Sequence, residues 1–263
     1  MMNPSVLLLS TQVSPLTDAQ FKQATWDYVQ NTATATTKWG DIGDLDVSGV
    51  KDFSYAFSTI RDQAGGSLVG GGNPKAATFV GTAISKWDTA SATSLVSTFE
   101  DAGEMNADLT GWKVGKVVTL WNTFNGASKF AGTGLSAWDT ASVTSLAFIF
   151  QSASVMNADL TGWKVGKVVT LQHTFFSASK FTGTGVDTWD VAKVTEMGAT
   201  FLSATSLTSC NKRKIADAWK SSSTVFDIDT TYGTEWADDK CAPLTNVQFK
   251  EATCKFCTRT PIL

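Results

Sequence analysis

The chain has 263 residues, of which 43% are hydrophobic and 17% are charged, and its formal net charge is −3. Because lysine and arginine form no clustered stripe, we expect neither nucleic acid nor an anionic membrane surface as a partner. The longest candidate apolar run covers only residues 6–9, whereas a transmembrane helix needs roughly 20 residues, so no membrane insertion is expected in this segment.

Residues 1–14 show no periodicity, and we interpret them as a leader or linker, although they lack the basic start and apolar core of a secretion signal. Residues 15–39 are predicted to form an N-terminal cap that begins with a helix. Thr17 and Gln20 have capping-box spacing, and helical spacing of apolar residues continues to about Gln30. Such a helix would cover the exposed face of the first repeat.

The cap opens a module that is predicted to span residues 15–242, with repeats over residues 40–207. A weak first repeat starts at Leu45, and a glycine-rich insertion follows it over residues 61–76. Five tryptophans then recur at steps of 25 or 26 residues, each followed twelve residues later by a phenylalanine. These residues are the predicted repeat core: Trp87, Phe99, Trp112, Phe124, Trp138, Phe150, Trp163, Phe175, Trp189 and Phe201. Because repeat proteins bury apolar faces between neighbouring copies, we expect the tryptophan rings to pack on one another.

Two repeat types alternate, and the string at residues 105–120 recurs verbatim at residues 156–171, so the duplicated unit has 51 residues. Within one repeat, the short β-branched segment Lys116–Leu120 favours a strand, and Asn122–Phe130 favours a short helix or 3₁₀ turn with one buried side. The expected fold is therefore an α/β repeat solenoid of the leucine-rich-repeat type, with one short strand and one short helix per 25–26 residues.

The repeat pattern stops at residue 207, and residues 208–242 are predicted to form a cysteine-containing C-terminal cap. A helix is predicted over Ser209–Ser222, where Ile215 and Trp219 are four residues apart. All four cysteines follow the repeats: Cys210, Cys241, Cys254 and Cys257. We predict a disulfide between Cys210 and Cys241, which would indicate an oxidising compartment, with the other two cysteines paired separately or free. Zinc binding by all four is the alternative, although the second close cysteine pair of a zinc ribbon is absent.

A sequence from the start of the module returns near the end of the chain. Residues 243–253 closely repeat residues 15–25. We therefore interpret residues 243–263 as the truncated or degenerate start of a second module.

The repeats resemble a known family. Residues 138–146, Trp-Asp-Thr-Ala-Ser-Val-Thr-Ser-Leu, and the Phe-Gln-Ser-Ala-Ser-Val-Met-Asn at residues 150–157 are similar to the repeat of BspA-like leucine-rich-repeat surface proteins. That repeat also occurs in mycoplasma surface lipoproteins and is expanded in some microalgae. In the last copy, the matching residues are Asp190, Val191, Val194, Thr195, Met197, Phe201 and Ala204. The resemblance spans residues 40–207, although Lys replaces Asp after Trp112 and Trp163. It implies an extracellular or cell-surface solenoid used for adhesion or partner binding, and it supplies no catalytic residues.

Groups that could support catalysis are sparse in the sequence. The single histidine, His173, stands where other copies have Asn122, Phe148 and Ala199, and neither a phosphate-binding loop nor a nucleophile elbow is present. We therefore expect no enzymatic activity and no cofactor. Two alternatives stay open at this point, which are calcium binding by acidic clusters such as Asp41, Asp44 and Asp46, and ice binding by a threonine ladder.

We expect a non-enzymatic surface repeat protein that mediates adhesion or protein or glycan binding through an extended solenoid face, with a ligand on a cell or matrix surface. The candidate binding face is formed by four duplicated lysines: Lys113, Lys116, Lys164 and Lys167. Weak contacts repeated along a rod gain strength through multivalency. The alternatives are that these lysines only keep the rod soluble, and that the protein is a structural spacer or a self-assembling surface-coat component.

Overall fold

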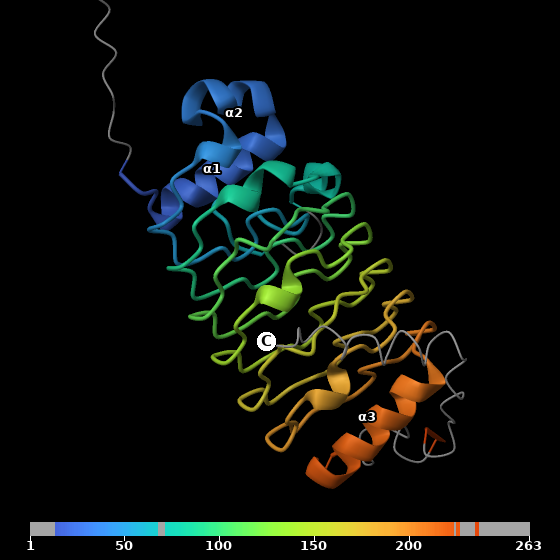
Figure 1. Ribbon diagram of the computed structural model, residues 1–263. Coiled ribbons are helices and arrows are strands. Elements are labelled where there is room, and N and C mark those ends of the chain that lie inside the picture. The colour runs from blue at the N-terminus through green and yellow to red at the C-terminus, as the bar shows by residue number, and fades with distance from the viewer. Residues whose placement is uncertain (1–13, 68–71, 224, 227–234, 237–263) are drawn as a thin grey trace, which may run out of the picture.

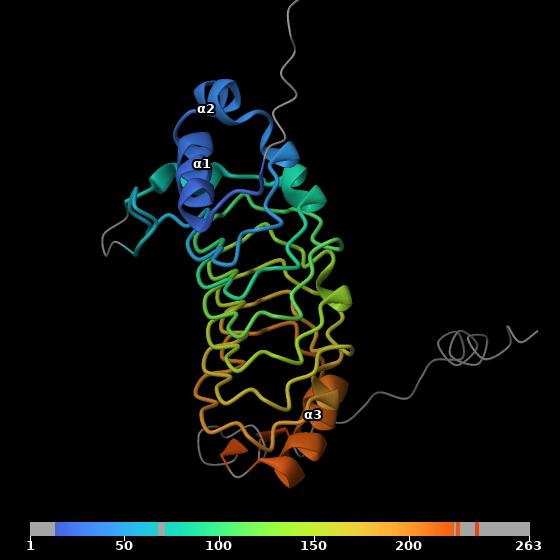
Figure 2. The same cartoon turned by 90° about the vertical axis from the view of Figure 1, so that its left-hand side faces the viewer.

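The computed structural model describes residues 14–67, 72–223, 225–226 and 235–236. The chain winds into a column of stacked coils with helices at both ends (Figure 1). Seen from the side, the coils lie above one another in a common register (Figure 2). The elements in chain order are α1 (Asp18–Gln30), α2 (Thr32–Trp39), η1 (Ile42–Asp44), η2 (Pro74–Thr78), η3 (Thr82–Lys86), η4 (Leu135–Ala137), η5 (Val186–Thr188) and α3 (Ser209–Ser222), where η marks a 3₁₀ helix.

Single parallel β-bridges join equivalent residues of successive coils. The bridged residues are Asp52, Ser94, Thr119, Ser145, Thr170 and Glu196. Each lies seven residues after the tryptophan of its repeat, or after Leu45 in the first. We number coils 1–6 and count positions within each coil from that residue as position 0: Leu45, Trp87, Trp112, Trp138, Trp163 and Trp189. The bridge register therefore follows the sequence period, and the longer step from coil 1 to coil 2 holds the insertion.

The prediction of one strand and one helix per repeat is wrong. The described part of the coils contains isolated bridges and turns but no β-strand. The segment Asn122–Phe130, predicted to be a short helix or a 3₁₀ turn, is a series of turns. The short 3₁₀ helices η3, η4 and η5 lie elsewhere, just before position 0 of alternate coils. The molecule is therefore a column of coils built from turns and not an α/β solenoid of the leucine-rich-repeat type.

A left-handed backbone at position 10 explains this difference. The residues there all have φ between 51° and 60°: Tyr55, Ser97, Asn122, Phe148, His173 and Ala199. In coil 3, Asn122 N–H donates to Ala147 of the next coil (3.2 Å), whereas Thr123 N–H turns back to Leu120 of its own coil (3.2 Å). Because consecutive N–H groups alternate between the two directions, neither an extended strand nor an α-helix can form.

Glycine is required where one repeat type approaches its predecessor. Gly134 precedes η4 with φ +93°, and a Cβ atom on it would lie 2.2 Å from the backbone N of Thr110. That N–H is in turn bonded to the Asp108 carboxylate at 2.8 Å. The two alternating repeat types therefore fit together because a glycine turn of one packs against an aspartate turn of the other.

The interior consists of two aromatic columns. The tryptophan rings at position 0 stack between coils, with centroid separations of 6.2 Å for Trp87 and Trp112 and 6.3 Å for Trp138 and Trp163. The phenylalanines at position 12 form a second column with separations of 5.4–5.8 Å: Phe57, Phe99, Phe124, Phe150, Phe175 and Phe201. Such ring pairs add to the stabilisation from buried area.

Tryptophan occupies position 0 because its indole N–H has a partner in the preceding coil. Trp112 Nε1 donates to the Ile84 carbonyl at 3.0 Å, and Trp163 Nε1 donates to the Leu135 carbonyl at 2.8 Å. Each acceptor lies three residues before position 0 of the preceding coil. Coil 1 has no preceding coil, and Leu45, which carries no donor, occupies position 0 there.

Helix α1 closes the N-terminal end of the column, as the sequence predicted. Its N-cap Thr17 and its Gln20 form the expected capping box. Phe21 packs on Phe53 of coil 1 (centroids 4.7 Å apart) and on Trp87 of coil 2 (5.5 Å).

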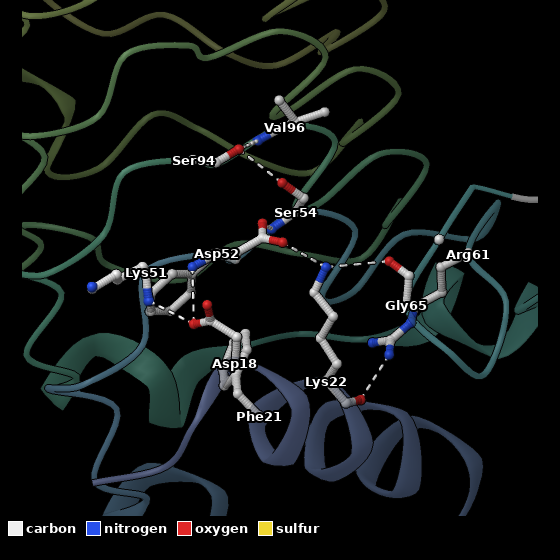
Figure 3. A network of polar contacts seen from close by, with 12 residues as sticks. Asp18, Phe21, Lys22, Lys51, Asp52, Ser54, Arg61, Gly65, Ser94 and Val96 are labelled. Atoms are coloured by element: carbon white, nitrogen blue, oxygen red, sulfur yellow. Dashed lines mark hydrogen bonds and ion pairs between the residues drawn. The ribbon is translucent and has the colours of Figure 1, made fainter.

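Polar contacts fix α1 to the first coil (Figure 3). The Asp18 carboxylate accepts the N–H groups of Lys51 (2.7 Å) and Asp52 (3.2 Å). Lys22 Nζ forms an ion pair with Asp52 at 2.8 Å. The fully buried Arg61, from the insertion, donates to the Lys22 carbonyl at 2.7 Å.

Helix α3 closes the other end, over the residues predicted from the sequence. Trp219 stacks on Trp189 of coil 6 at 6.3 Å, and its Nε1 donates to the Val186 carbonyl at 3.1 Å. Val186 stands three residues before position 0 of coil 6, so Trp219 continues the tryptophan column.

Most of the predictions for the two ends of the chain concern residues that the structure does not describe. Cys210, in α3, is disulfide-bonded. The other three cysteines lie outside the described residues, so the Cys210–Cys241 pairing stays a prediction. The second module at residues 243–263 and residues 1–13 of the leader also lie outside them. Among the helices that the structure describes, none is long and apolar enough to cross a bilayer.

Candidate binding surface

The predicted core residues lie inside the column. All ten are at most 4% exposed, so they hold the coils together and are not open to a ligand. A binding surface must therefore come from the outward positions of the coils.

Two of the four candidate lysines are paired. Lys113 Nζ lies 3.2 Å from Asp88 and Lys164 Nζ lies 3.3 Å from Asp139, in each case an aspartate of the preceding coil. The hydrogen bond from Lys113 holds the pKa of Asp88 below its usual value. The residues at position 1 are Asp46, Asp88, Lys113, Asp139, Lys164 and Asp190, so the aspartates outnumber the lysines. Position 1 therefore carries no net positive charge.

The other two candidates, Lys116 and Lys167, are exposed at position 4 of coils 3 and 5. One coil lies between them, and Ser142 occupies the same position there. The four lysines therefore do not form one continuous basic patch. Their role in binding stays a prediction.

His173 lies in an aromatic environment that the sequence did not indicate. Its ring is half-buried at position 10 of coil 5, with centroids 4.9 Å from Phe148 and 4.9 Å from Phe176. Its Nδ1 is 3.0 Å from the Gln151 side-chain oxygen. The sequence had suggested only that the position tolerates varied residues.

These rings belong to a surface that crosses three coils. Trp121, at position 9 of coil 3, is 38% exposed and meets Phe148 edge-on at 6.4 Å. We name the set Trp121, Phe148, His173 and Phe176 the aromatic strip. In coil 6, Leu202 at position 13 is 52% exposed and stands where coil 5 has Phe176.

A polar cluster occupies the same positions in coils 2 and 3. Glu100 and Asn122 are each only 7% exposed. The Glu100 carboxylate accepts from Asn122 Nδ2 at 3.1 Å and from Asn125 Nδ2 at 3.4 Å. Burial raises the pKa of Glu100 above its usual value. The residues at these positions therefore change along the column, from nearly buried polar groups in coils 2 and 3 to aromatic rings in coils 4 and 5.

Sequence reasoning missed this surface, although the duplication contains a signal for it. The verbatim repeat ends at residue 120 and its copy at residue 171. The next differences fall on outward positions 9, 10, 13 and 14: Trp121 and Gln172, Asn122 and His173, Asn125 and Phe176, Gly126 and Ser177. The inward positions 11 and 12 between them stay Thr and Phe in both copies. The copies diverge where the side chains leave the core.

The acidic cluster considered for calcium is engaged in turns. Asp41 accepts from Gly43 N–H at 2.8 Å, and Asp46 accepts from Ser48 N–H at 3.1 Å. Within the described ranges, no group of three or more His, Cys, Asp or Glu residues is arranged to hold a metal ion.

Position 6 bears on the ice-binding alternative. Exposed threonine and valine alternate there: Thr93, Val118, Thr144, Val169 and Thr195. The Thr144 hydroxyl donates to the Val118 carbonyl of the preceding coil at 2.9 Å. The row therefore has a threonine only in alternate coils, and the threonine hydroxyls donate hydrogen bonds to backbone carbonyls of the preceding coil. Ice binding stays untested.

Comparison with known proteins gives a family. Residues 74–133 and 107–219 match the model of the family described as "Mycoplasma protein of unknown function, DUF285". The two matches overlap, and together they cover more than half of the chain, including coils 2–6 and most of α3. No curated protein and no solved structure matches the chain.

Proposed function

Because the chain belongs to the DUF285 family of mycoplasma proteins of unknown function, we propose that it is a surface-associated repeat protein that binds a partner and catalyses no reaction. The observation that carries the proposal is the aromatic strip on the outside of the column. The likeness of the repeats to those of BspA-like surface proteins supports the location and an adhesive role.

Exposed aromatic rings favour binding over a purely structural role. A side chain needed only to hold the coils together gains most from full burial, yet Trp121 leaves more than a third of its surface in solvent. Rings of this kind supply much of the affinity where proteins meet ligands, because each has a large apolar area and few rotatable bonds.

The scaffold holds the strip in a fixed arrangement. Phe148 and His173 sit on left-handed turns whose N–H groups are bonded to the next coil, at 2.9 Å to Gln172 and 3.0 Å to Gly198. A surface that is already ordered loses little conformational entropy when a partner binds.

His173 contributes to this proposal as a ring. It packs between Phe148 and Phe176, and its Nδ1 is hydrogen-bonded to an amide side chain and not to a carboxylate. A histidine that acts as a general base usually lies within hydrogen-bonding distance of a nucleophile and is oriented by a carboxylate or a backbone carbonyl. The environment of His173 instead suits contact with a ligand.

The proposal is tested by the binding of purified protein to intact cells and to matrix-coated surfaces. We expect saturable binding by the wild type, and a loss of roughly tenfold or more in affinity for the Trp121→Ala/Phe176→Ala variant. The matched control is Val118→Ala/Val169→Ala, which removes two exposed side chains outside the strip and should bind normally. If the wild type shows no saturable binding, the alternative that the protein is a structural spacer is favoured. If the Trp121→Ala/Phe176→Ala variant binds as well as the wild type, the aromatic strip is not the binding site.

The lysine hypothesis is tested in the same assay with Lys113, Lys116, Lys164 and Lys167 all changed to Gln. Because Lys113 and Lys164 are already paired with aspartates, we expect at most about a threefold change in affinity. A larger loss than that of the strip variant would transfer the binding role to the lysines.

A further inference from the structure

We propose that the ligand of the aromatic strip is an extended, uncharged polysaccharide that lies along the column and crosses successive coils. This inference rests on the proposed function and narrows its partner to one chemical class.

The first support is the spacing of the rings. Trp121, Phe148 and His173 come from three consecutive coils. The ring centroids of Trp121 and Phe148 are 6.4 Å apart, and those of Phe148 and His173 are 4.9 Å apart. The step follows from parallel backbone segments, which lie about 4.8 Å apart. Sugar rings in an extended polysaccharide follow one another at a similar step, so one sugar can meet one coil.

The second support is the shape of a sugar ring. A pyranose has an apolar C–H face and a polar edge of hydroxyl groups. The apolar face can lie on an aromatic ring, where it buries apolar surface and gains dispersion contacts. Trp121, which is 38% exposed, supplies such a ring at position 9, and the half-buried rings of Phe148, His173 and Phe176 continue the apolar surface at positions 10 and 13.

The third support is the polar surroundings of the rings. Asn125, Gln151 and Gln172 are half-buried beside the strip, and Ser152 is exposed there. Amides and hydroxyls both donate and accept hydrogen bonds, as sugar hydroxyls do. The Gln151 side chain is already held by its hydrogen bond to His173, so it loses little freedom on binding.

The absence of charged side chains indicates a neutral ligand. Positions 9, 10, 13 and 14 of coils 3, 4 and 5, all of them described, contain no lysine, arginine, aspartate or glutamate. An acidic polysaccharide would gain from cations in the strip, and none is present there. In coil 2, two carboxylates occupy these positions: Glu100 is buried against Asn122 and Asn125, and Asp101 is exposed beside Gly126, at the end of the strip away from Phe148 and His173.

The dimensions of the strip favour a polysaccharide over a protein. A stable protein interface covers about 800 Å² on each partner, with a broad apolar centre. The strip is only one or two side chains wide, and Phe148, His173 and Phe176 are already half-buried. A chain of sugars needs a narrow track of this kind, about three rings long at one ring per coil.

The test uses purified wild-type protein and calorimetric titration with soluble glycans. The neutral set contains oligosaccharides of β-1,4-glucan, β-1,3-glucan, chitin and mannan, and the acidic set contains alginate and polygalacturonate. We expect saturable binding to at least one neutral series, with affinity that rises up to about three or four sugars and then levels off. Binding to the acidic set alone, or an affinity independent of chain length, would overturn the proposal.

Variants locate the site. Trp121→Ala should weaken binding to the neutral series by roughly tenfold or more, and Trp121→Phe should weaken it less because a ring remains. Val118→Ala, an exposed change outside the strip, should bind like the wild type. Unchanged melting temperatures would show that all three variants fold. Equal binding by Trp121→Ala would overturn the proposal.

Treated cell surfaces separate this inference from the proposed function. Cellulase, β-1,3-glucanase, chitinase and mannanase degrade the four neutral polysaccharides, and protease removes proteins. Strip-dependent binding that is lost after these glycosidases supports the polysaccharide. Strip-dependent binding that survives the glycosidases but is lost after protease overturns it and leaves the proposed function standing. No binding before any treatment would overturn both.

Discussion

The two ends of the column are closed by helices that use different chemistry. At the C-terminal end, Trp219 of α3 repeats the contacts of a coil tryptophan, with the same stacking and the same indole hydrogen bond. At the N-terminal end, α1 contains no tryptophan that continues the column at position 0; it packs Phe21 on Phe53 of coil 1 and adds a set of polar contacts. Helix α3 thus continues the tryptophan column at the C-terminal end, whereas α1 ends the column at the N-terminal end with different contacts.

The direction of the hydrogen bonds between coils explains the need for a terminator. At position 6, each N–H donates to the preceding coil, as Val118 does to the Thr93 carbonyl at 3.1 Å. Lys51, at position 6 of coil 1, has no preceding coil, and the Asp18 carboxylate of α1 takes its N–H at 2.7 Å. An open edge of this kind can pair with another chain, so the carboxylate also protects against association. Each terminal coil is therefore closed by a helix that supplies the partner its backbone needs: the Asp18 carboxylate for the Lys51 N–H at one end, and the Trp219 indole N–H for the Val186 carbonyl at the other.

The largest expected effect is at the C-terminal end. Trp219→Ala should lower the free energy of unfolding by about 3–5 kcal/mol, because it removes a large buried ring and leaves the Val186 carbonyl without its donor. Trp219→Phe keeps a ring and should cost about 1–2 kcal/mol. Urea denaturation measures both. A loss below about 1 kcal/mol for the alanine variant would show that α3 is not part of the stacked column.

The next effect concerns the buried cation beside α1. Arg61 is fully buried and donates to Thr25 Oγ1 (2.8 Å) and to the carbonyls of Ala56 (2.7 Å) and Lys22 (2.7 Å). Burial lowers its pKa to about 10, so it stays protonated at neutral pH. Arg61→Met fills a similar volume but removes the hydrogen bonds that the guanidinium donates to these three acceptors, and should cost about 2–4 kcal/mol in chemical denaturation.

A matched control for this change lies on α3. Arg213→Met removes a partly exposed arginine whose ion pair with Asp217, one helical turn away, is solvent-accessible. It should change the free energy of unfolding by less than about 0.5 kcal/mol. Equal effects of the two substitutions would mean that the buried arginine has no special role at the N-terminal end.

A smaller effect tests the edge directly. Asp18→Ala removes the acceptor for the Lys51 and Asp52 N–H groups and should cost about 1–2 kcal/mol. Asp18→Asn keeps one side-chain oxygen and should cost less. The alanine variant should also associate more strongly, as measured by analytical ultracentrifugation. A stable, monomeric Asp18→Ala variant would contradict the role assigned to the carboxylate.

The smallest effect is a pH dependence at the N-terminal end. Partial burial raises the pKa of Asp52, but hydrogen bonds from Lys22 and Ser54 outweigh it, so the pKa lies below its usual value. A carboxyl with a lowered pKa in the folded state stabilises the protein above its unfolded pKa of about 3.9, and this contribution is lost as pH falls through the lowered value.

The Asp52→Asn variant isolates that contribution. The side chain of Asp52 is 39% exposed, so we expect only about 0.5–1 kcal/mol at neutral pH. The difference in unfolding free energy between wild type and Asp52→Asn should shrink as the pH is lowered from 6 towards 3. A constant difference over that range would show that the ion pair contributes nothing.

The helices and the core could be read from the sequence because local signals and periodicity agreed. The capping box of Thr17 and Gln20 placed α1, and the spacing of Ile215 and Trp219 placed α3. The tryptophan and phenylalanine steps identified buried residues because only inward positions must keep the same shape in every coil. The aromatic strip could not be read this way, since its residues differ from coil to coil.

The strand and helix within each repeat were mispredicted because the decisive conformation has no consistent residue type. Position 10 is left-handed in every coil, yet only Asn122 and His173 among its residues belong to the types enriched there. Phe148 and Ala199 adopt the same φ without any local reason. Side-chain patterns such as Lys116–Leu120 therefore indicated a strand that the backbone does not form.

The sequence alone determined the period, the register between coils and the residues that fill the interior, because stacking requires the same buried shapes at each step. Tertiary structure decided the path of the backbone and which side chains face outward. A left-handed residue other than glycine costs about 1–2 kcal/mol by itself. The hydrogen bond from its N–H to the next coil, such as that from Phe148 to the Gln172 carbonyl, offsets this cost. The left-handed conformation is therefore stable only in the assembled column.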